Sequence, residues 1–288
     1  MRSLRPAFPP LCPALPLGLA LSLSLAVAGC ASVPLKEGGT LTSYSNLGAP
    51  KGKIAKKRIY VDGPALAAVK TASIMPTTYA PGAASDVRSA ADRALVTNVM
   101  DRALCVALSD KYRMVQPGQP ADIVIRSVIT DVVPTNKAMA GISAAVTVGS
   151  GFAMPSNIPV SVPRLPFGLG GLAVEAEAVD SVGVQRAAMV WARGANSIQD
   201  NPRYSEVGDA YGLATKFASD YSKMLIAGRE PKAFSMALPS RQRVRSWLGG
   251  KPKYAACESY GRAPGLLGVV ASNYGLPPQW TEKKPKTY

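Results

Sequence analysis

Residues 172–193, LAVEAEAVDSVGVQRAAMVWAR, decide the fold of this chain. From Leu172 to Val179 polar and apolar residues alternate, which is the period of a β-strand. The turn residues DSVG then lead into a second strand that ends at Arg193. Two such runs around a short turn predict an antiparallel hairpin.

Glu175 and Glu177 lie on one face of the first strand of this hairpin, roughly 7 Å apart, because side chains two residues apart point the same way. A carboxylate pair at that spacing could supply the acid and base of a glycoside hydrolase. The solvated face of an antiparallel sheet also explains both glutamates, and we favour this simpler interpretation. A carboxylate-based hydrolase would need one of them in a cleft.

Further strands are expected on the amino-terminal side of the hairpin. The run from Asp122 to Val132 carries isoleucines on one face and valines on the other. Apolar residues on both faces predict a central strand that is covered on both sides. A short strand over residues 59–62 is expected to join the sheet in parallel.

Two amphipathic helices are predicted beside these strands. Over residues 89–109 the apolar positions repeat with the helical period, and Ser89 followed by Asp92 resembles a capping box. A second helix is predicted over residues 206–227, where Gly228 is a natural stop. These patterns predict one α+β domain, with a four- to six-stranded, mainly antiparallel sheet and both helices on one face.

That domain should cover residues 58–228, interrupted by an apolar insertion over residues 134–171. The insertion has only two charged residues, Lys137 and Arg164, with five prolines and six glycines. We interpret it as a long loop, and such loops are often functional. It could be mobile or self-packed, act as a partner-binding flap, or rest on a membrane or a protein. Its apolar run is too short to span a bilayer.

The first 29 residues have the features of an export signal. Basic residues precede a short apolar stretch that ends in Val27-Ala28-Gly29-Cys30. A cysteine directly after small residues indicates a lipobox, with cleavage between Gly29 and Cys30 and lipid attached to Cys30. The alternative is an ordinary signal peptide that happens to end near a cysteine.

Lipidation places the mature chain on a membrane through acyl chains such as palmitate, and two or three chains on one cysteine are enough for stable anchoring. Ala31 and Ser32 follow Cys30 and no aspartate does, so we expect the outer membrane, with the protein facing the periplasm. Residues 30–57 should then form a lipidated tether between the anchor and the domain.

Composition argues against catalysis and for anionic partners. The chain has no histidine, which removes the commonest general base and metal ligand, so we expect no metal, no cofactor and no enzymatic activity. The formal net charge is +15, and export makes nucleic acid an unsuitable partner. Two basic groups could contact cell-wall carboxylates, lipopolysaccharide phosphates or lipid head groups, or simply be solvated: Lys51, Lys53, Lys56, Lys57 and Arg58, and then Arg241, Arg243 and Arg245.

The basic extension over residues 229–288 is rich in proline and glycine, and it could lie along the domain or stay disordered until a partner binds. Cys105 projects among the polar residues of the first predicted helix. Cys12 leaves with the signal and Cys30 is lipidated, so Cys257 is the remaining partner. We predict a Cys105–Cys257 disulfide, since exported proteins form such bonds, with two free thiols as the alternative.

The order of several short motifs resembles a known family. After the lipobox come TSYSNL (42–47), YVD (60–62), ADRAL (91–95), TDVVPTN (130–136) and GLAVEAE (171–177), followed by the closing helix. This order resembles the domain of unknown function 3313 family of bacterial lipoproteins over roughly residues 40–227. The resemblance implies a lipoprotein and brings no activity or active-site residues.

Two functions remain open from the sequence. The leading hypothesis is a non-enzymatic adaptor or assembly factor of the cell envelope, bound to a protein partner through the apolar insertion or the aromatic, basic extension. The second is a module that binds anionic cell wall or lipopolysaccharide through the two basic groups.

Overall fold

The computed structural model describes residues 33–153, 164–231 and 238–283, with residues 147–153 described by their backbone alone. The predicted signal peptide and the lipidation site Cys30 lie outside these ranges, so cleavage and lipidation stay predictions. Within the described residues, no helix is both long and apolar enough to cross a membrane.

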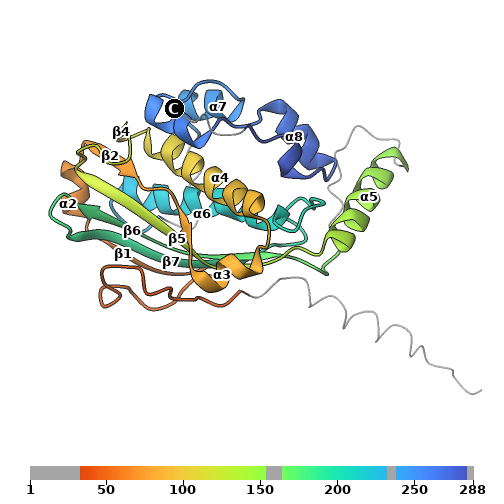
Figure 1. Cartoon of the computed structure of the whole chain (residues 1–288), viewed down its shortest axis with the longest axis horizontal. Coiled ribbons are helices and arrows are strands. Elements are labelled where there is room, and N and C mark those ends of the chain that lie inside the picture. The colour runs from red at the N-terminus through yellow and green to blue at the C-terminus, as the bar shows by residue number, and fades with distance from the viewer. Residues whose placement is uncertain (1–32, 154–163, 232–237, 284–288) are drawn as a thin grey trace, which may run out of the picture.

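A mixed sheet of seven strands forms the centre of the fold (Figure 1). Its order is β1-β7-β6-β5-β2-β4, and β3 also pairs with β5. The strands are β1 (Lys56–Val61), β2 (Thr71–Ile74), β3 (Thr78–Tyr79), β4 (Arg113–Val115), β5 (Ile123–Val133), β6 (Gly171–Asp180) and β7 (Gln185–Gly194). The predicted α+β class and the β6–β7 hairpin are confirmed. The sheet has more strands than expected, and β2, β3 and β4 pair in parallel, so it is mixed rather than mainly antiparallel.

The predicted parallel pairing of the first strand is wrong. β1 runs antiparallel to β7, with Lys56 opposite Ala192 and Val61 opposite Ala187. The chain before β1 crosses beneath the sheet and returns, because Val33 packs near Ala192 whereas the carbonyl of Ser43 meets Gln185 at the far end of β7. The chain therefore enters β1 at the end where β7 finishes, which makes the pair antiparallel.

The prediction that residues 30–57 form a tether is also wrong for the described part of that segment, which begins at Val33 and packs on the sheet. Leu41 and Leu47 are buried against Ala188 and Val190 on the sheet face opposite the helices. This amino-terminal segment runs below the sheet in Figure 1 and forms a layer of the fold. Both faces of the central strands are therefore covered.

The two long helices, α4 (Ala90–Leu108) and α6 (Gly208–Ala227), pack on each other and on one face of the sheet, as predicted (Figure 1). The Ser89 side chain accepts the Asp92 N–H at 3.2 Å and so caps α4. α6 ends at Gly228, whose φ of +60° is the left-handed conformation of a helix stop. The ring of Trp191 on β7 meets Phe217 of α6 edge to face.

The insertion over residues 134–171 contains a helix, α5 (Lys137–Ala153), which corrects the expectation of a loop. The Asn136 side chain accepts the Met139 N–H at 3.1 Å and caps the first turn. The segment from Lys137 to Ala153 also has no proline, so nothing in it prevents backbone hydrogen bonding. The sequence did not predict this helix because the segment contains glycines, which disfavour helices, and lacks the charged residues that would mark a polar helix face.

The carboxy-terminal extension lies along the outer side of α4 (Figure 1). Between residues 238 and 283 it forms α7 (Arg241–Trp247), the 3-10 helices η2 (Ala255–Tyr260) and η3 (Pro278–Trp280), and α8 (Leu266–Asn273). Two further short helices are α2 (Gly63–Ala68), between β1 and β2, and α3 (Pro81–Asp86), between β3 and α4. The extension is joined to α4 by the predicted disulfide between Cys105 and Cys257, with Cα atoms 5.6 Å apart.

The polar face of α4 is buried by this extension, so the outward placement expected for Cys105 is wrong. Asp101 lies on the same face and accepts hydrogen bonds from the backbone N–H and the hydroxyl of Thr77. Burial raises the pKa of Asp101 from 3.8 to about 7, against the opposing effect of those two bonds.

The raised pKa of Asp101 predicts a pH dependence of stability. Between the unfolded value of 3.8 and the folded value of about 7, the folded state binds the proton more tightly. The stability contribution of this carboxyl is therefore full below that interval and falls as pH rises through it. Relative to Asp101→Asn, the wild type should lose up to about 1.4 kcal/mol per pH unit between pH 5 and 7. Urea unfolding of both proteins measures this, and a difference that does not vary with pH would contradict it.

Candidate functional site

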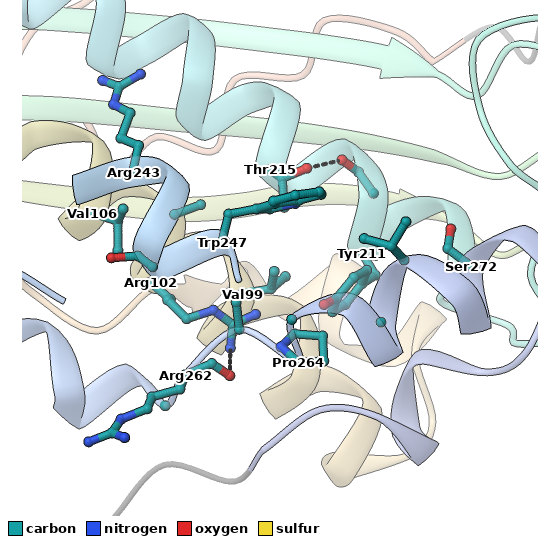
Figure 2. A pocket seen from close by; sticks show the side chains of 18 of the residues that line it. Val99, Arg102, Val106, Tyr211, Thr215, Arg243, Trp247, Arg262, Pro264 and Ser272 are labelled. Carbon is teal, nitrogen blue, oxygen red and sulfur yellow. Dashed lines mark hydrogen bonds between the residues drawn. The ribbon is translucent and has the colours of Figure 1, made fainter. Parts of the chain in front are cut away.

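A pocket of about 500 Å³ lies between α4, α6 and the carboxy-terminal extension (Figure 2). Val99, Ala103 and Val106, which follow one side of α4, form its apolar wall. Figure 2 shows the indole of Trp247, from α7, reaching across the pocket towards Thr215 of α6. Trp247 is 56% exposed, so a large apolar ring stands at the rim of the pocket.

The charged residues that line this pocket are all of one sign. Arg102, Arg203, Arg243 and Arg262 line it, and none of the described aspartates or glutamates does. Three of these arginines are paired with carboxylates from outside the lining: Arg102 with Glu282, Arg243 with Asp110 and Arg262 with Glu258. The lining is therefore positively charged, but carboxylates outside the lining neutralise three of its four arginines.

The Arg102 pair fixes the end of the described chain. Nη1 and Nη2 of Arg102 each donate to Glu282 at 2.7 Å, and the hydroxyl of Tyr211 also donates to Glu282. Burial lowers the pKa of Arg102, but its bonds and charge interaction with Glu282 more than compensate and raise it. This bidentate pair ties the extension to α4 and α6 at the edge of the pocket.

Arg203 differs from the other three arginines. Its guanidinium lies 4.9 Å from the centre of the Tyr211 ring, and no carboxylate comes within ion-pair distance of it among the described residues. Burial lowers the pKa of Arg203, although the nearby Tyr211, Glu282 and Asp209 partly offset this. Arg203 also borders a smaller pocket of about 200 Å³. An anion that entered the pocket would meet a half-buried cation that contacts Tyr211 but has no carboxylate partner among the described residues.

Glu175 and Glu177 are placed elsewhere, beneath the sheet. Their exposed fractions are 0% and 1%, so the predicted solvated face is wrong. The cause is the amino-terminal segment, whose N–H groups bind these carboxylates: Gly38 and Thr40 donate to Glu175 at 2.8 and 2.9 Å, and Thr42 donates to Glu177 at 2.7 Å. Neither glutamate lines the pocket, so the cleft that a carboxylate hydrolase needs is not at this pair.

The hydroxyl of Tyr44 also donates to Glu175, at 2.7 Å. Burial, and then this bond to a carboxylate, raise the pKa of Tyr44 to about 12. The two glutamates thus act as acceptors that fasten the amino-terminal segment to the sheet.

The eight basic residues singled out in the sequence do not form one surface. β1 and α7 lie on opposite sides of the molecule in Figure 1. Within the described residues, carboxylates already pair with three of the eight, and Lys53, Lys56, Lys57, Arg241 and Arg245 have no carboxylate partner. The paired residues are Lys51 with Glu230, Arg58 with Glu37 and Arg243 with Asp110. Arg245 instead donates to the Lys251 carbonyl at 3.1 and 3.2 Å.

Sequence reasoning did not predict the pocket, because its walls come from three distant parts of the chain. The clue available was the row of polar residues with Cys105 on α4, which marks the surface that the extension covers. Metal binding has no visible site in the described part of the chain, where no cluster of His, Cys, Asp and Glu could hold an ion.

Comparisons with known proteins identify one family and several similar solved structures. The family described as "Protein of unknown function (DUF3313)" matches residues 36–221. The chain is similar to the PelC dodecamer from Paraburkholderia phytofirmans, at 13% identity and a TM-score of 0.35, covering 62% of this chain and 100% of that one. A leucine-to-methionine variant of PelC gives 11% identity and a TM-score of 0.34 with the same coverage. No curated protein matches by sequence.

Proposed function

We propose that this chain, which belongs to the DUF3313 family of proteins of unknown function, is a non-enzymatic adaptor of the bacterial cell envelope. In this proposal, lipid on Cys30 anchors it to the outer membrane, and the domain faces the periplasm. The observation that carries the adaptor role is the pocket beneath the extension, with Trp247 at its rim and with Arg203, which has no carboxylate partner among the described residues, in its lining. The partner is an envelope protein that inserts a segment there.

Charge complementarity specifies the segment. The lining is apolar along α4 and positive around it, so a carboxylate flanked by apolar side chains fits best. The carboxylate would pair with Arg203, and its neighbours would pack on Val99, Val106 and Trp247. Tryptophan and arginine are the residues that most often dominate the binding energy of protein interfaces.

The same lining favours binding over catalysis. Its serine and threonine hydroxyls, Thr215, Ser219, Ser246 and Ser272, have no histidine or carboxylate beside them among the described residues of the lining. A serine or threonine nucleophile is weak without an adjacent base. Arginine and apolar side chains can hold an anionic segment without any proton transfer.

A photocrosslinking experiment tests the adaptor proposal. With benzoyl-phenylalanine at Trp247 in living cells, we expect a covalent adduct with one envelope protein, at a peptide that contains Asp or Glu beside apolar residues. Arg203→Ala should weaken this binding about 10- to 100-fold, the value of a charge-assisted hydrogen bond. The matched control is Arg241→Ala, an exposed arginine outside the pocket, which should leave the yield unchanged.

A second candidate is the binding of anionic cell wall or lipopolysaccharide. It is favoured by Lys53, Lys56 and Lys57, which lie on or next to the edge strand β1 and have no carboxylate partner among the described residues. Retention on isolated cell wall that falls steeply with salt, and that Arg203→Ala does not change, would support this candidate and contradict the adaptor.

A further inference from the structure

Helix α5 presents apolar side chains to solvent. Ile142 and Val146 are 51% and 48% exposed, and they share one side of the helix because they are four residues apart. Between Lys137 and Ala153 the sequence has a single charged residue, Lys137 itself, which pairs with Glu206 at 2.9 Å. The rest of α5 therefore has no charged side chain that would favour its exposure to water.

Two exposed aromatic residues extend this apolar surface. Tyr204 lies against α5, since a Cβ placed on Gly141 would approach its ring within 3.1 Å. Phe167 belongs to the strip that returns along α5, in which the Leu165 N–H donates to the Ser143 hydroxyl at 3.2 Å. We call the exposed residues Ile142, Val146, Phe167 and Tyr204 the end patch. Isolated apolar residues are common on surfaces, whereas a group of this kind marks an interaction site.

The described chain begins at the same end of the sheet. Val33 is buried against Gly171, the first residue of β6, in a cluster with Ala173 and Ala192. Val133, the last residue of β5, packs on this cluster, and α5 follows directly after it. The entering chain and α5 therefore meet at one end of the molecule.

The proposed lipid attachment must be close to this end. Cys30 precedes Val33 by three residues, and three residues of fully extended chain reach at most about 11 Å. Because Val33 is fixed in the fold, the anchor cannot be a long tether that holds the domain far from the bilayer. The proposed anchor therefore brings the membrane surface close to Val33, at the end of the sheet from which α5 starts.

We propose that the end patch rests on the surface of the membrane that holds the lipid anchor, an inference that depends on the anchoring part of the proposed function. The occupant is the bilayer itself. With 17 residues, α5 is about 25 Å long, so it lies along the interface with its apolar side in the head-group boundary. Tyr204 and Phe167 add the aromatic rings that favour such an interface. The domain is thereby held in one orientation, with the hairpin turn pointing away.

Site-specific fluorescence on the full lipidated protein tests this orientation. Ile142→Cys, Val146→Cys and Val182→Cys each receive an environment-sensitive nitrobenzoxadiazole label, since the disulfide and the lipid occupy the native cysteines of the mature chain. Val182 is the control, because it is 80% exposed in the turn at the opposite end of the hairpin. The vesicles contain phosphatidylethanolamine, phosphatidylglycerol and a spin-labelled quencher lipid.

The labels at positions 142 and 146 should shift to the blue and be quenched on reconstitution, and the label at 182 should do neither. A Phe167→Cys reporter should show the same quenching and lose it when Ile142→Asp is added, with the protein still on the vesicles. Equal quenching at 142, 146 and 182 in protein that does bind vesicles would overturn the orientation alone. Failure of the protein to float with vesicles at all would instead refute the lipid anchor.

Discussion

Asp209→Ala is expected to lower the free energy of unfolding by about 3–5 kcal/mol, because it strands a buried charge. Asp209, in the first turn of α6, accepts hydrogen bonds from Nη1 and Nη2 of Arg164, at 2.6 and 3.2 Å. It also accepts the Gly170 N–H at 2.7 Å and the Thr135 hydroxyl at 3.0 Å. Both partners of the pair are 1% exposed, so water cannot replace the lost carboxylate.

The bonds of Asp209 have a further consequence because they fix both ends of the insertion. Thr135 precedes α5, and Arg164 and Gly170 lead back to the sheet. Loss of Asp209 should therefore free α5 as well as destabilise the fold, which amide hydrogen exchange can resolve from the global unfolding measured in urea.

The matched control for Asp209→Ala is Glu206→Ala, three residues earlier in the chain. Glu206 pairs with Lys137 at 2.9 Å, but the two side chains are 49% and 47% exposed. A solvated pair of this kind contributes no more than about 1 kcal/mol. Equal losses for the two variants would show that the Arg164–Asp209 pair does not hold the insertion in the way described.

The elements that the sequence predicted well are those whose periodicity comes from a single buried face. The hairpin around Val174 and Trp191 and the two long helices follow from the alternation of apolar and polar residues within short windows. Local signals also gave the cap at Ser89 and the stop at Gly228. Each of these depends on contacts between residues close in sequence, which a pattern records directly.

The burial of Glu175 could not be predicted in this way. Alternation assigns Glu175 and Glu177 to one face of β6, but it does not tell what covers that face. The cover is a segment more than 130 residues away, whose Gly38 and Thr40 N–H groups satisfy the carboxylate. A polar residue with all its bonds made inside the fold looks, in the sequence, like one exposed to water.

The candidate site escaped prediction for a related reason. Arg102 and Cys105 read as the solvated side of an amphipathic helix, and they are buried only because the extension lies across them. The disulfide could be predicted by counting cysteines. The pocket could not, because it depends on the positions of α7 and α8 relative to α4, which the cysteine count does not specify. The only sequence feature that indicated a covered surface on this side of α4 was Cys105, a cysteine placed by the helical period among polar residues.

Removal of the disulfide is the other change with a large expected effect. Cys105 and Cys257 are 152 residues apart, and in the chain-entropy model the cross-link of such a loop is worth about 5 kcal/mol. The double variant Cys105→Ala with Cys257→Ala should lose about that much stability in urea. The wild type, unfolded and refolded with reductant, should fall to the same value, whereas reductant should not affect the double variant.

The loss should be most visible at the pocket, because the disulfide joins its two walls. Cys257 itself lines the pocket, and the extension that follows it supplies Arg262, Pro264 and Val269. Without the cross-link, the Arg102–Glu282 pair and the Tyr260 hydroxyl, which donates to the Ile74 carbonyl at 2.7 Å, still hold the extension. The reduced protein should therefore keep its sheet and long helices, lose hydrogen-exchange protection first from residue 241 onward, and crosslink less from Trp247. Uniform loss of protection over the whole chain would contradict this order and would show that the extension and the sheet unfold as one unit.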